Sequence, residues 1–122
     1  MITLTRSKDF DRIFRHGSSV SSSEVVIYAL KRSKGKFSQP RAAFCVSKKF
    51  GKAVARNRVK RRLREVYRLN EGKLDAQWDV ILLARQGAAV VQFAQLEKKF
   101  LSLCRRAGIL KEVPRIPETA NL

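Results

Sequence analysis

The residues best suited to chemistry in this sequence are the cations of ARNRVKRRLREVYR, which occupies residues 55–68. The stretch holds seven basic residues, one carboxylate and one asparagine. A helix that is merely solvated usually carries both signs of charge, so this composition indicates an anion outside the protein. Arginine binds phosphate through paired N–H donors, and Asn57 can donate to and accept from a base or a sugar hydroxyl. The pattern therefore predicts phosphate binding.

Patterns typical of catalysis or metal binding are not found in the sequence. Cys45 and Cys104 lie far apart and form no CxxC pair, and His16 is the single histidine. Carboxylates are scattered, and serine, cysteine and histidine do not occur in an arrangement typical of nucleophilic catalysis. We therefore expect no catalytic residue, no metal ligand and no cofactor bound by the protein alone. Both cysteines are expected to fill small spaces in the core.

The charge balance indicates a polyanionic partner. The 122 residues suffice for one domain, and 27 Lys and Arg against 10 Asp and Glu give a formal net charge of +17. Nucleic acid is the first candidate partner and an anionic membrane surface the second. The longest apolar run, residues 80–84, is too short to span a bilayer, and MITLTRSKDF lacks the apolar core of a secretory signal. We expect a cytoplasmic protein without a membrane partner.

The elements that must position these cations follow from periodicity. An N-terminal helix is predicted where Phe10, Ile13 and Phe14 recur at spacings of three and four. Ser7 is predicted to cap this helix and Gly17 to end it. The remaining pattern predicts, in order, a loop or weak edge strand at 18–23, a strand at 24–30, a loop at 31–40, a strand at 41–47, a cationic turn at 48–53, a buried strand at 78–84 and a helix at 91–107 followed by Gly108.

On a helical wheel, at about 100° per residue, the cationic stretch has one narrow apolar stripe. Ala55, Leu63 and Val66 fall close to Val59, and this stripe is predicted to pack on a sheet. The polar positions are Arg56 and Lys60 on one flank, Arg58 and Arg62 on the other, and Asn57, Arg61, Arg64 and Arg68 on the opposite face. The helix is thus expected to be buried along the stripe and cationic elsewhere.

Strand, helix and strand in the middle of the chain predict a βαβ-like unit, with further helices before and after it. The fold class is therefore predicted as α+β, an α/β sandwich in which three helices pack on one small central sheet. A crossover of this kind is ordinarily right-handed. We assign residues 1–112 to a single RNA-binding domain and residues 113–122 to a flexible C-terminal tail.

The segment FCVSKKFGKAVARNRVKRRLREVYR, residues 44–68, is the most distinctive motif of the chain. It resembles the signature of the protein subunit of bacterial ribonuclease P, an SxSKKxG turn followed by an RNR helix. DFDRIFRHG at 9–17 resembles the N-terminal DFxxVFxxG motif of that family. Later segments of the family are matched by VVIYAL at 25–30, WDVILLARQGAA at 78–89 and LEKKFLSLCRRAGIL at 96–110. The resemblance covers nearly the whole chain except the tail.

The resemblance implies a ribonucleoprotein endonuclease that removes the 5′ leader from precursor transfer RNA. In such an enzyme the large RNA subunit holds the catalytic magnesium ions, and the polypeptide itself holds none. The implied fold is ribosomal-protein-like with an unusual left-handed βαβ crossover, here the strand at 41–46, the helix at 56–70 and the strand at 79–84. No obligate protein partner is expected.

The resemblance also implies roles for individual residues. The RNR helix docks on the catalytic RNA in the family, and the matching residues are Arg56, Asn57, Arg58, Lys60, Arg61, Arg62, Arg64 and Arg68. The single-stranded leader lies on a concave sheet face beside the first helix, and the matching residues are Phe10, Phe14 and Tyr28, with Lys48 and Lys49 at the rim. Stacking suits a leader of variable sequence, because it contributes ~1–3 kcal/mol per base whatever the base.

Two other classes of protein stay open from the residues alone. A structural RNA-binding protein of the ribosomal type would use the same charge without substrate turnover. A DNA-binding module is the third class, weakened by the lack of a second helix placed for a helix-turn-helix and of zinc ligands. Phe10 and Phe14 at helical spacing, and Tyr28 in a strand, are also typical of a core. Exposure of the aromatic rings would separate the first two classes, because a ribosomal protein has no use for an exposed aromatic groove.

Overall fold

The two longest strands, β3 (Val25–Lys31) and β5 (Trp78–Ala84), lie side by side in a five-stranded sheet with β5 at its centre. They pair antiparallel along their whole length. β4 (Arg41–Cys45) pairs in parallel with the other side of β5, and the strand order is β1-β4-β5-β3-β2. The computed structural model describes residues 1–111 of the chain.

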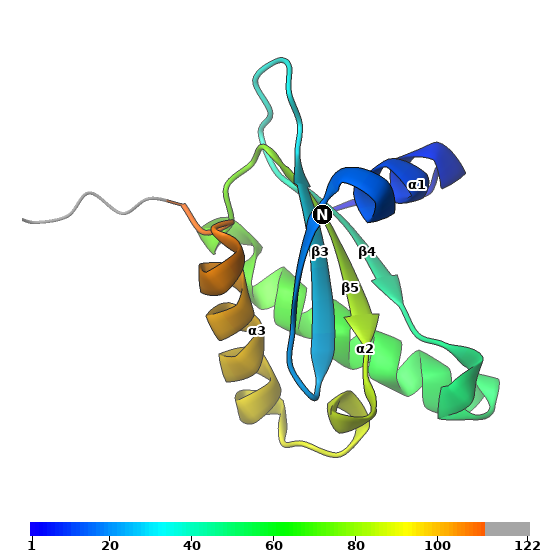
Figure 1. Cartoon of the computed structure of the whole chain (residues 1–122). Helices are drawn as coiled ribbons and strands as arrows, with labels where there is room; N and C mark the ends of the chain where they lie inside the picture. Colours follow the sequence, from blue (N-terminus) through cyan, green and yellow to red (C-terminus); the bar gives the residue numbers. More distant parts are fainter. Residues whose placement is uncertain (112–122) are drawn as a thin grey trace, which may run out of the picture.

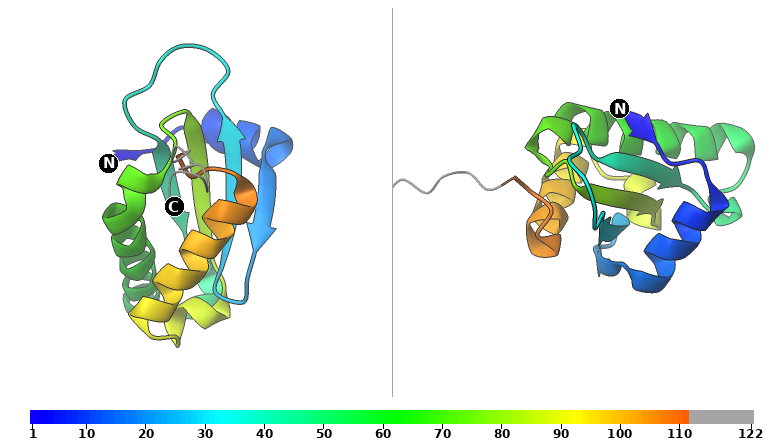
Figure 2. Two further views of the ribbon diagram at one scale, coloured as in Figure 1. Left: turned by 90° about the vertical axis from the view of Figure 1, so that its left-hand side faces the viewer. Right: turned by 90° about the horizontal axis from the view of Figure 1, so that it is seen from above.

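Three helices cover the two faces of this sheet, as predicted (Figure 1). α1 (Ser7–His16) lies on one face, and α2 (Ala53–Asn70) and α3 (Phe93–Ala107) pack on the other. The view from above in Figure 2 shows α1 and α2 on opposite sides of the strands. The α+β sandwich predicted from the sequence is confirmed.

Alternation along the strands divides the apolar side chains into two clusters. The larger cluster lies between the sheet and the pair α2 and α3, and includes Val25, Ile27, Val80, Leu82, Tyr67 and Phe100. The smaller cluster lies between the sheet and α1, and its buried members are Leu4, Ile13, Ala43 and Ile81. Because α1 covers less of its face than the two other helices cover of theirs, several strand side chains on the α1 side stay half-buried.

The connection from β4 through α2 to β5 is left-handed. In Figure 1 the two parallel strands point down the page, β5 lies to the left of β4, and α2 passes behind the sheet. A right-handed crossover would place α2 on the side of the viewer. The general preference for right-handed crossovers therefore gives the wrong hand here, and the left-handed crossover implied by the resemblance is confirmed.

The two edge strands are the shortest. β1 (Ile2–Thr3) pairs in parallel with β4 and is not predicted from the sequence, because two residues are too few to show a periodic pattern. β2 (Ser18–Ser21) pairs antiparallel with β3 at the opposite edge. Of the two predictions for residues 18–23, the edge strand is confirmed.

Backbone contacts set both ends of α1. The prediction of Ser7 as its cap is wrong, because the amides of Asp9 and Phe10 donate to the carbonyl of Arg6, and Ser7 therefore lies inside the helix. Gly17 follows the helix as predicted. A Cβ at this position would lie 2.5 Å from the carbonyl oxygen of Ile13 and 2.8 Å from that of Ala29. Glycine thus permits the close approach of α1 to β3.

The remaining boundaries agree with the sequence pattern to within three residues, the largest difference being the start of α2 at Ala53 rather than at residue 56. Short 3-10 helices occur at Lys48–Phe50, Glu71–Lys73 and Gln86–Ala89. Gly108 has a φ of 72° and ends α3 in the left-handed conformation that favours glycine. Cys104 is buried as predicted, and burial raises its pKa to about 12, whereas Cys45 is half-buried.

Two further expectations concern the tail and the membrane. The predicted flexible tail, residues 113–122, lies outside the described residues. Within residues 1–111, no helix combines the length and the apolar character needed to cross a membrane.

Candidate nucleic-acid interface

α2 is buried along a stripe that begins later than the sequence predicts. Its buried residues are Val59, Leu63, Val66, Tyr67 and Asn70. Ala55, predicted to belong to the stripe, is exposed, because the first turns of α2 extend past the edge of the sheet in Figure 1. The side chains at 53–58 are therefore exposed or, at Arg56, half-buried. Solvent surrounds this end of the helix.

The outer face of α2 gathers cations that have no acidic partner among residues 1–111. Lys60, Arg61 and Arg64 are exposed and form no ion pair in that part of the chain. One shallow depression on this face is lined by Met1, Asn57, Lys60, Arg61, Arg64, Glu65 and Arg68. An anion can enter this depression at little cost, since the cations already repel one another. We call these cations and Asn57 the α2 face.

Two arginines of α2 already donate hydrogen bonds to other groups of the protein. Arg62 donates from Nη2 to the carbonyl of Val91 and so ties α2 to the segment before α3. Arg68 donates to Glu65 through Nε at 3.0 Å and Nη2 at 2.5 Å, and this hydrogen bond lowers the pKa of Glu65. Arg58 is exposed like Arg61 and Arg64. The predicted set of eight residues thus contains both free and occupied donors.

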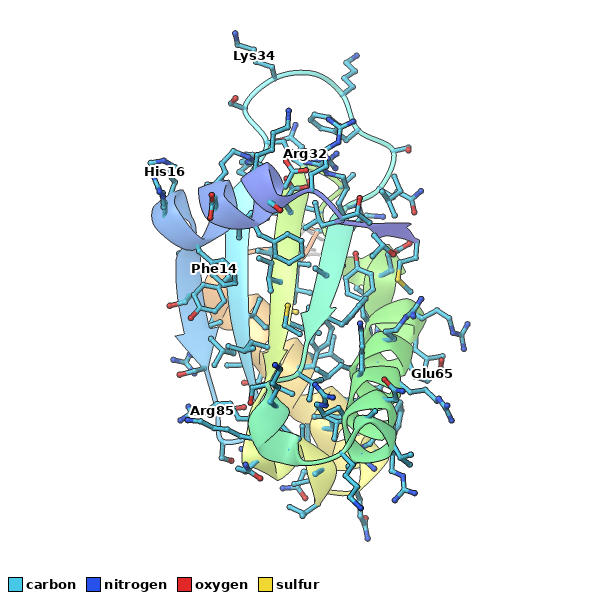
Figure 3. The ribbon with its side chains drawn as sticks, turned by 90° about the vertical axis from the view of Figure 1, so that its right-hand side faces the viewer. Phe14, His16, Arg32, Lys34, Glu65 and Arg85 are labelled. Atoms are coloured by element: carbon cyan, nitrogen blue, oxygen red, sulfur yellow. The ribbon has the colours of Figure 1, made fainter. Side chains whose placement is uncertain are left out.

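The three predicted aromatic side chains come together beside α1. The ring centroids of Phe14 and Tyr28 lie 4.8 Å apart in an edge-to-face arrangement, and those of Phe10 and Phe14 lie 6.5 Å apart. Phe14 is 45% exposed, while Phe10 and Tyr28 are half-buried. Figure 3 shows Phe14 below α1, over the sheet. The sequence left open whether these rings belong to a core. The exposed ring of Phe14 does not.

The sheet continues this surface away from α1. Register places Val26 beside Leu83, and Leu83 beside Cys45, one row beyond Tyr28 on the same side of the sheet. These three side chains are half-buried, and burial raises the pKa of the Cys45 thiol, which stays protonated at neutral pH. We call this row, together with Phe10, Phe14 and Tyr28, the aromatic face.

Cations lie at the end of the sheet away from α1. Lys48 and Lys49 are exposed in the 3-10 helix after β4. Arg85 follows β5, donates from Nη1 to the carbonyl of Ser22 at 3.2 Å, and lies at the same end of the sheet in Figure 3. Arg85 was not among the predicted site residues. Its signal in the sequence is a basic residue directly after a buried strand.

Asp79 is a second residue that the predicted site lacks. Its carboxylate is fully buried and accepts hydrogen bonds from Arg41 Nε at 2.8 Å, Arg41 Nη2 at 2.7 Å and Arg12 Nη2 at 2.6 Å. Arg32 Nε lies 3.5 Å away. Burial alone would raise the pKa of Asp79, but these arginines outweigh it and hold the pKa below its ordinary value. The sequence signal is a lone carboxylate inside the apolar run WDVILLA.

Within residues 1–111, His, Cys, Asp and Glu side chains do not gather in groups of three or more that could hold a metal ion. What the arrangement offers is electrostatic attraction on the α2 face and stacking on the aromatic face. Both are modes of binding a nucleic acid.

Comparison with known proteins identifies the family. The family model for ribonuclease P matches residues 2–108. The chain belongs to the ribonuclease P protein family. Members are protein components of ribonuclease P, so this chain takes part in precursor transfer RNA processing together with an RNA subunit.

Relatives of known sequence and structure agree with this membership. The ribonuclease P protein component of Natranaerobius thermophilus is 38% identical over 112 residues, which cover 92% of this chain and 95% of that protein. The component from Streptococcus pneumoniae serotype 4 is 36% identical, over 88% of this chain and 85% of that protein.

Two solved ribonuclease P proteins share the fold. The Staphylococcus aureus RNase P protein superposes with a TM-score of 0.78 at 29% identity, over 91% of this chain and 99% of that one. The Thermotoga maritima protein gives a TM-score of 0.75 at 31% identity, over 87% and 97% of the two chains.

Proposed function

We propose that this ribonuclease P protein is a non-catalytic subunit that binds the RNA subunit through α2 and the 5′ leader of precursor transfer RNA through the aromatic face. The observation that carries the proposal is the contrast between two surfaces on opposite sides of one sheet, one cationic and one aromatic. A protein with these two surfaces can join a structured RNA to a single strand. Precursor transfer RNA as substrate would place the protein in the cytoplasm.

In this proposal the α2 face docks on the RNA subunit. Arginine forks and Lys60 contact phosphates, and Asn57 contacts a base or a ribose hydroxyl. The docking residues are Arg56, Asn57, Arg58, Lys60, Arg61, Arg62, Arg64 and Arg68. Arg61 and Arg64 contribute to the salt-dependent affinity, because their guanidinium groups are exposed and have no acidic partner among residues 1–111. The same holds for the exposed side chains of Arg58 and Lys60.

The leader lies on the aromatic face. Phe14 and Tyr28 stack on its bases, Phe10 supports Phe14, and Lys48 and Lys49 contact its phosphates at the far end of the sheet. Stacking of this kind tolerates any base, so one protein can serve leaders of different sequence. The proposed contacts add affinity for precursor over mature transfer RNA.

Catalysis belongs to the RNA subunit, which also holds most of the Mg²⁺ of the holoenzyme. The test compares purified RNA-free protein, the RNA subunit alone and the reconstituted complex on precursor transfer RNA. The protein alone should not cleave with or without Mg²⁺, and it should raise cleavage by the RNA at low Mg²⁺. Cleavage by RNA-free protein that one point substitution abolishes would contradict this division of labour.

A structural RNA-binding role of the ribosomal type is the second candidate. It shares the cationic helix and predicts binding of folded RNA without any effect on a substrate. Phe14, at 45% exposure beside Tyr28, disfavours it, because a purely structural subunit gains nothing from a solvent-exposed ring. The complex with the RNA subunit would then cleave precursor transfer RNA no better than the RNA alone.

A further inference from the structure

Two parts of α1 are attached to the sheet by different means. Residues 13–16 are held by the fully buried Ile13 and by Gly17, which directly follows the helix and whose backbone lies against the carbonyl of Ala29. Residues 7–12, the N-terminal part of α1, carry Phe10, and their polar attachments to the sheet are the 2.6 Å hydrogen bond from Arg12 to Asp79 and the weaker 3.9 Å ion pair between Asp9 and Arg41. The two attachments can therefore be removed separately.

Arg12 is an addition to an ion pair that is complete without it. Arg41 alone meets the Asp79 carboxylate through two hydrogen bonds within the sheet, from β4 to the neighbouring β5. Arg12 comes from α1 and is partly exposed, with its side chain 35% accessible. Asp9, one turn earlier, lies 3.5 Å from Arg12 and 3.9 Å from Arg41. The cluster therefore joins the N-terminal part of α1 to β4 and β5 beneath it.

We propose that Asp79 is a positioning residue for leader recognition: through Arg12 it holds the N-terminal part of α1, residues 7–12, so that Phe10 supports Phe14 against Tyr28. This inference rests on the leader role proposed for the aromatic face. The carboxylate itself, fully buried, does not touch the RNA. Its effect reaches the leader through the placement of the Phe10 ring, whose centroid lies 6.5 Å from that of Phe14.

The proposal predicts a coupling between Arg12 and Phe10. Without the hydrogen bond from Arg12 to Asp79, the N-terminal part of α1 can move away from the sheet, and Phe10 no longer supports the stack. Arg12→Gln should therefore have its effect on the leader through Phe10. Two residues that act through one contact show non-additive effects in a double-mutant cycle.

The experiment compares Arg12→Gln with Arg15→Gln in the complex with the RNA subunit. Arg15 is an exposed arginine of the same helix and forms no ion pair within residues 1–111, so the control removes the same charge without touching Asp79. The measured quantity is the ratio of affinities for leader-bearing and leaderless transfer RNA. Arg12→Gln should lower this ratio by roughly tenfold, the size of one lost stacking contact, and Arg15→Gln should leave it unchanged.

Two further variants keep the test decisive. Phe10→Ala should lower the ratio as much as Arg12→Gln does, and the double variant should lower it no further. Asp79→Asn, measured well below its melting temperature, should reproduce the Arg12→Gln ratio, while affinity for the RNA subunit stays the same in all variants. A ratio unchanged in Arg12→Gln, equal losses in Arg12→Gln and Arg15→Gln, or multiplicative losses in the double variant would each overturn the proposal.

The failure of this inference differs from the failure of the proposed function. If Phe14→Ala and Phe10→Ala lower the ratio but Arg12→Gln does not, the aromatic face binds the leader and Asp79 does not position it. If Phe14→Ala, Phe10→Ala and Arg12→Gln all leave the ratio unchanged, the leader role itself is lost, and this inference with it.

Discussion

Two groups of cations in this protein use the same residue type in opposite ways. On α2, Lys60, Arg61 and Arg64 are exposed and form no ion pair within residues 1–111. Next to α1, three arginines converge on the buried carboxylate of Asp79. The first group attracts an anion from outside, and the second holds an anion of the protein itself. Net charge alone cannot distinguish binding surface from architecture.

The difference has an energetic consequence. Exposed cations without partners contribute little to folding and much to the salt dependence of RNA binding. A buried carboxylate with its partners is the reverse case, because removing either member leaves an uncompensated charge in a place without water. Substitutions in the two groups should therefore change different observables.

Asp79→Asn should give the largest effect. It leaves the three guanidinium groups around a neutral amide, and the expected loss is about 3–5 kcal/mol of folding free energy, measured by denaturant unfolding. RNA binding by α2, measured where the variant is still folded, should be unchanged. A stability equal to that of the unsubstituted protein would mean that Asp79 does not stabilise the fold, and the proposed difference between the two groups of cations would be wrong.

The same variant has a defined pH dependence. The pKa of Asp79 is lowered by folding, so its contribution is fully present above its ordinary value of 3.8 and is lost as the pH falls through the lower pKa of the folded state. The stability difference between the unsubstituted protein and Asp79→Asn should be constant above about pH 5 and should shrink below about pH 4. Acid unfolding curves measure it.

Phe14→Ala should give the next largest effect, on the substrate rather than on the fold. The lost stacking should lower affinity for leader-bearing transfer RNA by ~1–3 kcal/mol, with affinity for leaderless transfer RNA unchanged. Phe37→Ala is the matched control, since this ring lies on the β3–β4 loop against Arg32, 3.6 Å from its guanidinium carbon. A lowered melting temperature with unchanged discrimination would return Phe14 to the core.

Glu65→Gln should give the smallest effect, and in the opposite direction. In the unsubstituted protein, Nε and Nη2 of Arg68 donate to the carboxylate of Glu65. The substitution removes this carboxylate and frees Arg68, so a further cation joins the α2 face. The dependence of log affinity on log salt should become steeper by roughly 0.7–0.9, the value of one phosphate contact. Titrations at several salt concentrations measure it, and an unchanged slope would mean that Arg68 lies outside the RNA contact.

Periodicity predicts the parts of the fold that are long and amphipathic. Three helices and the strands β3, β4 and β5 follow from spacing, because each buries one face or both. The two-residue strand β1 has no period to detect. The helical wheel gave a wrong prediction for Ala55. A wheel gives the direction of each side chain around the helix axis, and it cannot show that the helix extends past the sheet. The crossover hand came from the resemblance, because no local pattern encodes it.

The candidate site was predicted by residue type more completely than by contact. The α2 cations and the three aromatic rings follow from the sequence and its resemblance. Partners far apart in sequence do not: Arg12 and Asp79 are 67 positions apart, and the bond from Arg62 to Val91 spans 29. The sequence therefore shows how many arginines the protein has, while only the fold shows which of them already donate to other groups of the protein.

The central claim is that the free cations of α2 form the RNA interface, and the salt dependence of binding to the RNA subunit tests it most directly. Arg61→Gln combined with Arg64→Gln is compared with Lys34→Gln combined with Lys36→Gln, which removes two exposed charges from the loop between β3 and β4. The slope of log affinity against log salt should fall by about 1.4–1.8 in the α2 variant and stay unchanged in the loop variant. An unchanged slope in the α2 variant, with its helical circular dichroism intact, or an equal fall in both, would contradict the account.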